Sequence, residues 1–176
     1  MAKSKASELT PKINLVFVCS GNTCRSPMAE YIFKKYLKSK KSAAKYIVSS
    51  AGVFASEGDE ISEQSELTLK KLGVTLKKLH KARSTSISII QNADIIVCMT
   101  EAHRKELIGS EWYMYAAEDG KDRIIGTAAE LTGNDISDPY GGTAADYEFA
   151  ASCISAMCEP LLTAAESFRN NKFKAS

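Results

Sequence analysis

The 176-residue chain has no apolar run long enough to cross a membrane, which argues against a transmembrane segment. Its first residues are polar and contain lysine but lack the apolar stretch of a secretory signal, so residues 1–12 are expected to form a disordered leader. A net charge of +2 is too small to indicate binding to nucleic acid or to a membrane. No repeat or domain boundary interrupts the remainder, which predicts a single domain over residues 13–176.

Histidine is scarce and cysteine is irregularly spaced. The two histidines, His80 and His103, have no cysteine pair beside them, so neither a metal nor another cofactor is expected. The five cysteines are an odd number without a disulfide pattern, which favours reduced thiols and a cytoplasmic protein. Three of them are predicted to be packing residues: Cys98, Cys153 and Cys158.

Strand-like and helix-like segments alternate along the chain. This alternation predicts an α/β fold, a single-domain parallel sheet of four or five strands flanked by helices. Apolar runs predict strands at 13–18, 46–51 and 93–99, with weaker candidates at 76–80 and 122–126. Helical spacing of apolar residues predicts helices at 27–40, 60–72, 85–92, 101–109 and 143–170.

Two segments carry additional expectations. Pro160 falls inside the last predicted helix, where it should kink or break the helix because it has no backbone N–H and its ring clashes with the preceding turn. The segment 110–120 contains Trp112, Tyr113 and Tyr115, whose rings could flank a ligand pocket or pack a loop onto the core, and packing is the preferred interpretation.

The most informative segment joins the first strand to the first helix. It reads Cys19-Ser-Gly-Asn-Thr-Cys-Arg25 and continues as Ser26-Pro-Met-Ala-Glu30. The backbone N–H groups of a turning loop and of a helix N-terminus form a concave site for a phosphate-like group. The predicted phosphate-binding residues are therefore Ser20, Gly21, Asn22, Thr23, Cys24, Arg25 and Ser26.

The chemistry of this loop indicates phosphoryl transfer to sulfur. The positive end of the helix is expected to lower the pKa of Cys19 and so produce a thiolate nucleophile. The planar guanidinium of Arg25 can bind two phosphoryl oxygens at once. A nucleophile, an oxyanion site and a cation thus lie within seven residues of each other.

Other residues of the loop have expected structural roles. Gly21 and Asn22 suit a sharply turning backbone because both tolerate positive φ. Ser26 is expected to cap the helix, and its hydroxyl to donate a hydrogen bond to the Cys19 sulfur. Cys24 is open to two interpretations: a small residue filling the underside of the loop, or the partner of Cys19 in a reversible disulfide formed under peroxide.

The leaving group of such a transfer needs a proton, and Asp138 is the predicted donor. It lies in a polar stretch, and Pro139 restricts its backbone to extended geometry. A carboxyl group held there can act first as a general acid and then as a base towards water. Asp135 is the nearest rival and is interpreted as a plain loop residue. Tyr140 is predicted to form a wall of the substrate pocket.

These motifs resemble those of the low-molecular-weight protein tyrosine phosphatases, and most closely the bacterial branch that includes protein arginine phosphatases. The resembling segments are residues 19–30, 49–52, 80–83, 93–99 and 138–142. The resemblance implies a nucleophile at Cys19, a phosphate clamp at Arg25 and a general acid at Asp138. It therefore implies a protein phosphatase that forms a phosphocysteine intermediate on phosphorylated protein or peptide substrates.

The resemblance also implies a polar network of Asn22, Ser50 and His80 that holds the anion loop in shape. For the substrate it leaves phosphotyrosine and phosphoarginine open. Ser20 is the expected discriminating position, where typical tyrosine phosphatases carry a bulky aliphatic residue and the arginine branch carries threonine. Gly141 lacks the second aromatic ring found in many tyrosine-specific members, and this absence favours the arginine branch.

Two alternative functions remain open at this point. An arsenate reductase shares this loop but needs additional cysteines near the site to relay electrons, and Cys98, Cys153 and Cys158 are poorly placed for that. A non-catalytic oxyanion-binding thiol sensor is the second alternative. The simultaneous presence of Cys19 and Asp138 argues against it. The oligomeric state is not predicted.

Overall fold

The fold is built around a parallel sheet of four strands in the order β2-β1-β3-β4. A computed structural model describes residues 11–174, so nearly all of the expected leader lies outside the described residues. The strands are β1 (Ile13–Cys19), β2 (Tyr46–Gly52), β3 (Ile95–Cys98) and β4 (Ile124–Thr127). The predicted α/β class with a parallel sheet is confirmed.

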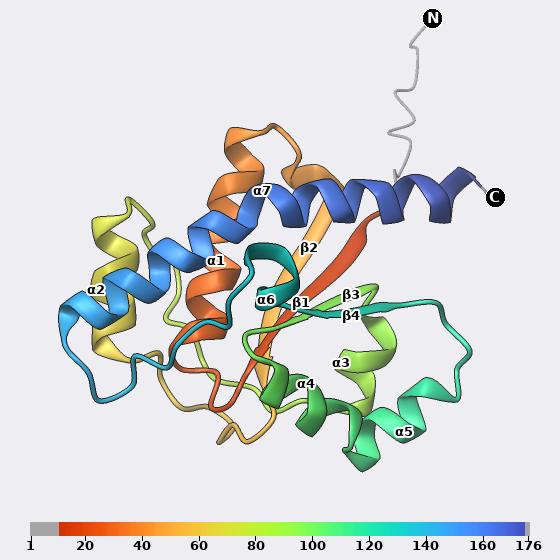
Figure 1. Ribbon diagram of the computed structural model, residues 1–176, viewed down its shortest axis with the longest axis horizontal. Coiled ribbons are helices and arrows are strands. Elements are labelled where there is room, and N and C mark those ends of the chain that lie inside the picture. The colour runs from red at the N-terminus through yellow and green to blue at the C-terminus, as the bar shows by residue number, and fades with distance from the viewer. Residues whose placement is uncertain (1–10, 175–176) are drawn as a thin grey trace, which may run out of the picture.

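Seven α-helices and one short 3-10 turn are described around the sheet within residues 11–174. They are α1 (Arg25–Ser39), the turn η1 (Ala43–Lys45), α2 (Glu63–Lys71), α3 (Ile87–Asn92), α4 (Glu101–Ile108), α5 (Glu111–Ala117), α6 (Ala128–Thr132) and α7 (Ala144–Lys174). Figure 1 shows α7 crossing the length of the molecule beside α1 and α2. None of the helices in this part of the chain is long and apolar enough to span a membrane.

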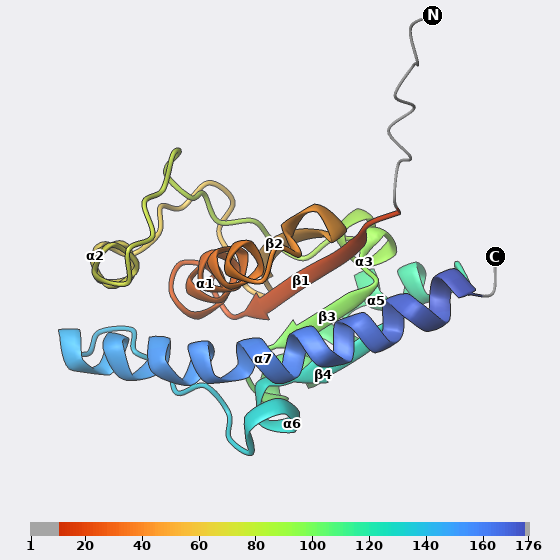
Figure 2. The ribbon, with the colours of Figure 1, turned by 90° about the horizontal axis from the view of Figure 1, so that it is seen from above.

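Both faces of β1 are buried, because successive strand residues point to opposite sides of a sheet. Leu15 and Phe17 join the hydrophobic cluster built with α1 and α7, whereas Val16 and Val18 join a second cluster that includes residues of α3 and α5. In Figure 2 α7 runs along the length of the molecule, α1 is seen nearly along its own axis beside β1 and β2, and α2 lies beyond the end of β1.

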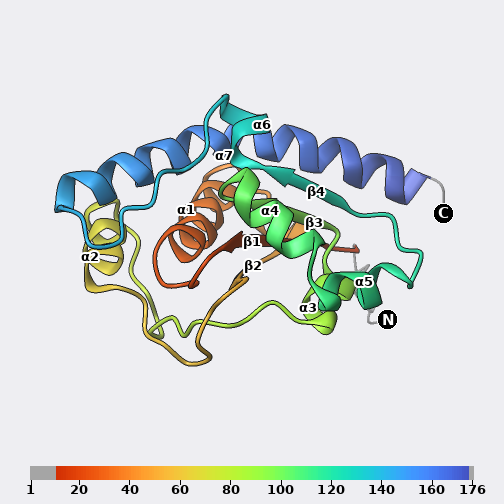
Figure 3. The same cartoon turned by 60° about the horizontal axis from the view of Figure 1, so that its bottom comes forward.

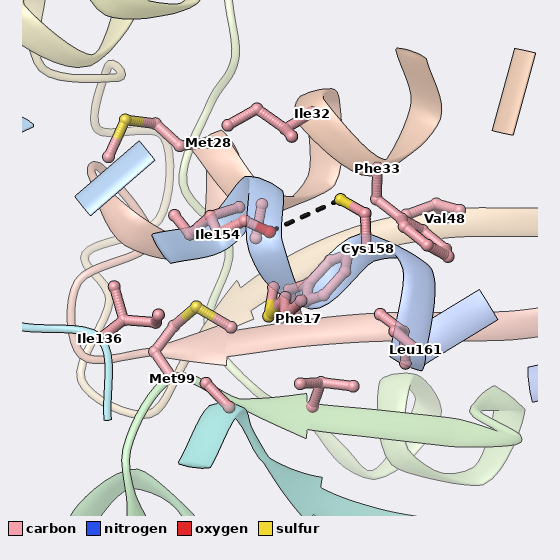
Figure 4. Close-up of a cluster of buried hydrophobic side chains, with 14 of the residues drawn as sticks. Phe17, Met28, Ile32, Phe33, Val48, Met99, Ile136, Ile154, Cys158 and Leu161 are labelled. Atoms are coloured by element: carbon pink, nitrogen blue, oxygen red, sulfur yellow. Dashed lines mark hydrogen bonds between the residues drawn. The ribbon is translucent and has the colours of Figure 1, made fainter. Parts of the chain in front are cut away.

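The larger core is centred on Phe17. Its ring meets that of Phe33 edge-on, with 5.8 Å between the ring centroids. Figure 4 shows Phe17 between Phe33 on α1 and Ile154 and Leu161 on α7. This packing fixes β1 and the start of α1 relative to each other, and thereby fixes the loop that joins them.

The strand order determines where a ligand site is expected. From β1 the chain crosses to β2 on one side of the sheet, and β3 and β4 then extend the other side. In open parallel sheets such a reversal leaves a crevice beyond the carboxyl ends of the strands. Figure 3 shows α4 and the segment that follows α6 on the side of the molecule where β1 leads into α1.

Two secondary-structure predictions were wrong. The weak strand candidate at 76–80 is a loop, because Lys77, Lys78 and Leu79 are all exposed and give the segment no buried face. The segment 110–120 contains helix α5, whose first turn is capped by the Ser110 side chain accepting a hydrogen bond from the Tyr113 N–H at 3.2 Å.

The expected packing of the α5 aromatic residues holds only in part. Tyr113 packs against the second hydrophobic cluster, as predicted. Trp112 and Tyr115 remain 50% and 59% exposed, so their rings do not pack a segment onto the core. A helix of this length can turn only one side towards the protein, and the residues on its other side are left in solvent.

Of the kink or break expected at Pro160, the break is absent. Helix α7 continues through this residue to Lys174. Met157, Cys158 and Leu161 on either side of the proline are all buried in the core. Tertiary packing on both sides therefore holds the helix together where the missing backbone hydrogen bond would otherwise end it.

Candidate active site

The loop between β1 and α1 forms a pocket of about 240 Å³ at the carboxyl edge of the sheet. Its lining comes from this loop and from the segment between α6 and α7, and consists of Cys19, Ser20, Gly21, Thr23, Cys24, Arg25, Asp138 and Tyr140. All eight belong to the site predicted from the sequence. Two further predicted residues are buried outside that lining: Asn22 in the same loop and Ser26 in the first turn of α1.

Cys19 ends β1 and is 2% exposed, with its Sγ 2.9 Å from Ser26 Oγ. Burial raises the pKa of the Cys19 thiol, while hydrogen bonds from Ser26 and Asn22 and the charge of Arg25 lower it. Burial is the largest influence, so the expected lowering of this pKa was wrong. Formation of the thiolate therefore depends on these donors and on the Arg25 charge.

Ser26 does not cap α1, contrary to the prediction. The helix begins at Arg25, its N-cap is Cys24, and no side chain caps it. The Ser26 hydroxyl instead contacts the Cys19 sulfur and accepts a hydrogen bond from Asn22 Nδ2 at 2.8 Å. The first-turn N–H groups are thus left without a side-chain acceptor, an arrangement suited to an anion at the helix end.

Arg25 connects the loop to the segment that carries the predicted acid. Its Nη2 donates to Asp138 Oδ2 at 2.7 Å, and its Nη1 donates to the Ile136 carbonyl at 3.2 Å. Its Nε is buried and has no hydrogen-bond partner among the described residues. A buried donor without a partner costs about 1–3 kcal/mol, and a phosphoryl oxygen would be a suitable acceptor.

Asn22 is the centre of the network behind the loop. It is fully buried and has a positive φ of 56°, a backbone conformation that asparagine tolerates better than most residues. Its Nδ2 donates to Ser50 Oγ at 2.9 Å as well as to Ser26, and its Oδ1 accepts from the Arg83 N–H at 2.9 Å. These bonds hold the loop in its turned conformation.

The structure brings His80 and Ser50 to Asn22, as the sequence resemblance implied. His80 Nε2 lies 3.2 Å from both the backbone oxygen and Oδ1 of Asn22, and burial lowers the pKa of His80. Ser50 donates to Glu30 Oε2 at 2.6 Å. Glu30 and Arg83 were not predicted as members of this network, although both lie in the segments that carry the resemblance.

Gly52, at the end of β2, allows β2 to approach the loop closely. A Cβ atom at this position would lie 2.3 Å from the Ser20 backbone oxygen and 2.9 Å from the Asn22 nitrogen. The next residues donate backbone hydrogen bonds to the loop, from Val53 to the Cys19 carbonyl and from Phe54 to the Ser20 carbonyl. Only glycine allows this approach without displacing the loop.

Sequence reasoning missed the role of His103. Its Nε2 lies 2.9 Å from Ser20 Oγ, and its Nδ1 lies 3.0 Å from Thr100 Oγ1. Burial, together with the nearby charge of Arg25, lowers the pKa of His103 to about 4, so its ring is neutral near pH 7. The signal available in the sequence was the position of Thr100-x-x-His103 directly after a buried strand.

The remaining polar candidates have clear surroundings. Cys24 is buried, with its Sγ 3.3 Å from Ser62 Oγ and 3.7 Å from Tyr147 Oη, and all five cysteines are free thiols. Asp135 accepts a hydrogen bond from the Glu101 N–H at 3.2 Å and so fixes the start of α4. No group of three metal-ligating side chains is found within residues 11–174.

Comparison with known proteins gives consistent matches. The family model described as low molecular weight phosphotyrosine protein phosphatase matches residues 14–172. A protein-arginine-phosphatase of Bacillus subtilis (strain 168) is 32% identical over 77% of this chain and 85% of its own length. The low molecular weight protein-tyrosine-phosphatase PtpB of Staphylococcus epidermidis is 39% identical over 77% of this chain and 87% of its own.

Solved structures agree with these matches. One is a mutant of the YwlE arginine phosphatase in which the active-site cysteine is replaced by a phosphorylated serine. It has a TM-score of 0.76 and 26% identity, over 88% of this chain and 96% of that one.

Proposed function

The chain belongs to the low molecular weight phosphotyrosine protein phosphatase family, and we propose that Cys19, Arg25 and Asp138 hydrolyse phosphoarginine side chains of protein substrates. The cysteine-based phosphatase chemistry is that of the family. The single observation that supports these residues is their convergence on one pocket: a buried thiol, a guanidinium and a carboxylate. The domain that carries them is proposed to extend over residues 13–176.

The proposed reaction has two steps. In the first, the Cys19 thiolate attacks phosphorus and the bond from phosphorus to the leaving nitrogen breaks. Asp138, protonated in the substrate complex, gives its proton to this nitrogen and becomes a carboxylate. In the second, Asp138 takes a proton from water, which attacks the phosphocysteine and releases inorganic phosphate. Ser26 Oγ, 2.9 Å from Sγ, stabilises the departing thiolate.

Arg25 and the loop stabilise charge in both steps. The buried Nε of Arg25 and the backbone N–H groups at the start of α1 point to an oxyanion as the ligand of this pocket. The comparison structure that carries a phosphorylated serine at its active site supports a covalent phosphoryl intermediate, and we assign the same position to Cys19 by its place at the end of β1.

We propose phosphoarginine as the preferred substrate because the pocket lining offers few aromatic side chains to stack on a phosphotyrosine ring. Among the lining residues described, Tyr140 is the one aromatic residue, and it is 76% exposed. Gly141 follows with a φ of 74°, so a larger aromatic residue at that position would be strained. Asp138 pairs with the guanidinium of Arg25, and once it has given up its proton its carboxylate can pair in the same way with the guanidinium that leaves the substrate.

The relatives do not separate the two substrates, because one is named an arginine phosphatase and the other a tyrosine phosphatase. We further propose that the protein acts in the cytoplasm, since its catalytic thiol and the other four cysteines are free. Neither a metal nor a cofactor has a part in the proposed steps, and nucleic acid is not a proposed partner.

The test is a side-by-side measurement of kcat/KM on a phosphoarginine peptide and a phosphotyrosine peptide of matched sequence. We expect the phosphoarginine peptide to be preferred by at least about tenfold. Cys19→Ser is the control: it should abolish turnover of both peptides while still binding inorganic phosphate. A preference for phosphotyrosine would contradict the proposed substrate, and wild-type turnover by Cys19→Ser would contradict the nucleophile.

A further inference from the structure

Ser20, His103 and Thr100 form a continuous hydrogen-bonded chain from the pocket into the protein. Ser20 lines the pocket next to Cys19, and its Oγ is 2.9 Å from His103 Nε2. His103 Nδ1 is 3.0 Å from Thr100 Oγ1 on the other side of the ring. The fold fixes this chain, because β1 and β3 pair side by side, with Val18 opposite Cys98, and Thr100 follows shortly after β3.

In this hydrogen-bonded series the two hydroxyl groups, of Ser20 and Thr100, compete for the single acceptor nitrogen of the His103 ring. His103 is 6% exposed and neutral near pH 7, so only one of its ring nitrogens can accept a hydrogen bond. Within residues 11–174 the hydroxyls of Ser20 and Thr100 have no hydrogen-bond acceptor besides this ring. Thr100 Oγ1 also accepts the His103 N–H as the N-cap of α4, which holds it in place.

The hydrogens of these three side chains can be arranged in two ways, which differ in the tautomer of His103, and a phosphoryl group in the pocket would favour one of them. In one, Ser20 donates to Nε2 and Nδ1–H donates to Thr100, so the Ser20 hydrogen points away from the pocket. In the other, Thr100 donates to Nδ1 and Nε2–H donates to Ser20, which frees the Ser20 hydrogen. A charged phosphoryl oxygen is the strongest acceptor available to that hydrogen, so binding favours the second arrangement.

We propose that His103 is a positioning residue whose Nε2–H tautomer, stabilised by Thr100, directs the Ser20 hydroxyl hydrogen onto the bound phosphoryl group. Ser20 then belongs to the phosphate site through its side chain. This inference deepens the proposed function, since it concerns the same pocket, but it depends only on a phosphoryl ligand. It does not depend on which amino acid carries the phosphoryl group.

The first test is the affinity for inorganic phosphate, measured by calorimetry at pH 7. We expect Ser20→Ala and His103→Leu each to weaken binding by about tenfold, the loss of one hydrogen bond to a charged group. The double variant should be no weaker than either single variant, because both remove the same bond. His103→Gln, which retains a side-chain N–H donor, should recover part of the loss.

The second test is spectroscopic and uses the wild-type protein. The chain has only two histidines, so 15N labelling of histidine gives ring signals for His80 and His103 alone, and His103→Gln assigns them. On addition of phosphate, the His103 ring should move towards the Nε2–H tautomer. His80 is absent from the pocket lining and should keep its own tautomer.

Two results would overturn the inference. Additive losses in the double variant would indicate that His103 only packs against its neighbours. An unchanged His103 tautomer on phosphate binding would indicate that Ser20 does not donate to the ligand. Neither measurement uses turnover, so failure to hydrolyse a phosphoarginine peptide would remove the proposed substrate and leave this inference standing.

Discussion

Asp138 is the residue whose assignment depends most on chemistry rather than on position. Its carboxylate is half-exposed, is bound to Arg25, and is further held by the Tyr140 N–H at 3.2 Å. Asp138→Ala should slow hydrolysis of substrates with poor leaving groups by about 100-fold or more, because only these need the proton. Activated aryl phosphates should lose far less.

The measurement is kcat at saturating substrate, determined for the wild type and for Asp138→Ala with a substrate of each leaving-group class. Asp135→Ala is the matched control, since that carboxylate only fixes the start of α4. Equal losses for both leaving groups in Asp138→Ala would show that Asp138 transfers no proton in the first step.

Cys24 leads to a prediction about oxidation. It is buried in the same loop as Cys19 as part of the larger hydrophobic cluster, and its sulfur also contacts the hydroxyl groups of Ser62 and Tyr147. Brief peroxide treatment should therefore produce a Cys19–Cys24 disulfide, and dithiothreitol should restore activity. Peptide mapping detects the bond. After the same peroxide treatment, the Cys24→Ser variant should lose activity that dithiothreitol does not restore. The Cys153→Ser variant, changed on α7, should recover like the wild type.

Residue by residue, the predictable part of the site was the part contiguous in sequence. Residues 19–26 could be predicted as one site because a contiguous segment offers a thiol, backbone N–H groups and a guanidinium together. Glu30, Arg83 and His103 were missed because each acts through another side chain, Ser50, Asn22 or Ser20, and such contacts exist only after folding. The pKa of Cys19 was wrongly predicted because burial cannot be read from a local motif.

At the level of elements, the strands buried on both faces were the easiest to predict. Apolar runs identified β1 and β3, the two central strands of the sheet. The edge strand β2 was also predicted, although two serines interrupt its apolar run and Ile47 is exposed, and the other edge strand, β4, was identified only weakly because Ile124 is exposed. The helix α5 was missed because its sequence is dominated by aromatic residues. Its cap, Ser110, was available as a signal and was not used.

Helix α7 allows a direct test of what holds it together at Pro160. Replacing this proline by alanine restores a backbone N–H within a helix that already passes through the position. We expect Pro160→Ala to raise the free energy of unfolding by about 1–2 kcal/mol, since a proline inside a helix costs about 3 kcal/mol and its rigidity in the unfolded chain offsets part of that. Urea unfolding measures the change.

Activity provides the control for this variant. Pro160 lies on α7 away from the pocket lining, so kcat/KM should stay at the wild-type value. A loss of stability instead would mean that the local geometry imposed by the ring is needed for the packing of Met157 and Leu161 against the sheet.

For the whole molecule, the two buried histidines predict how stability depends on pH. The pKa of His103 is lowered to about 4 and that of His80 is lowered in the same direction, both chiefly by burial. Above pH 6.5 the rings are neutral in both the folded and the unfolded chain. As the pH falls towards 4 the unfolded chain binds protons that the folded chain does not, so the fold loses stability.

The expected loss from His103 between pH 6.5 and about 4 is on the order of 2 kcal/mol after allowance for solvent screening. Urea unfolding at several pH values across this range measures it. His103→Gln should make the dependence shallower, because the variant has one fewer group to titrate in the unfolded chain. An unchanged slope would show that folding does not lower the pKa of His103.

The ion pair between Arg25 and Asp138 means that a carboxylate of the protein competes with a phosphoryl group for the Arg25 guanidinium. A carboxylate oxygen of the protein already occupies one edge of the guanidinium that the phosphoryl group would use. Nε of Arg25 is open to a phosphoryl oxygen, so only a phosphoryl group that also takes Nη2 would exchange one anion for another, and the strength of the internal pair would then reduce its net affinity. In that case the proposed acid would leave Arg25 when the phosphoryl group binds there, so occupancy of the pocket and release of Asp138 would be coupled.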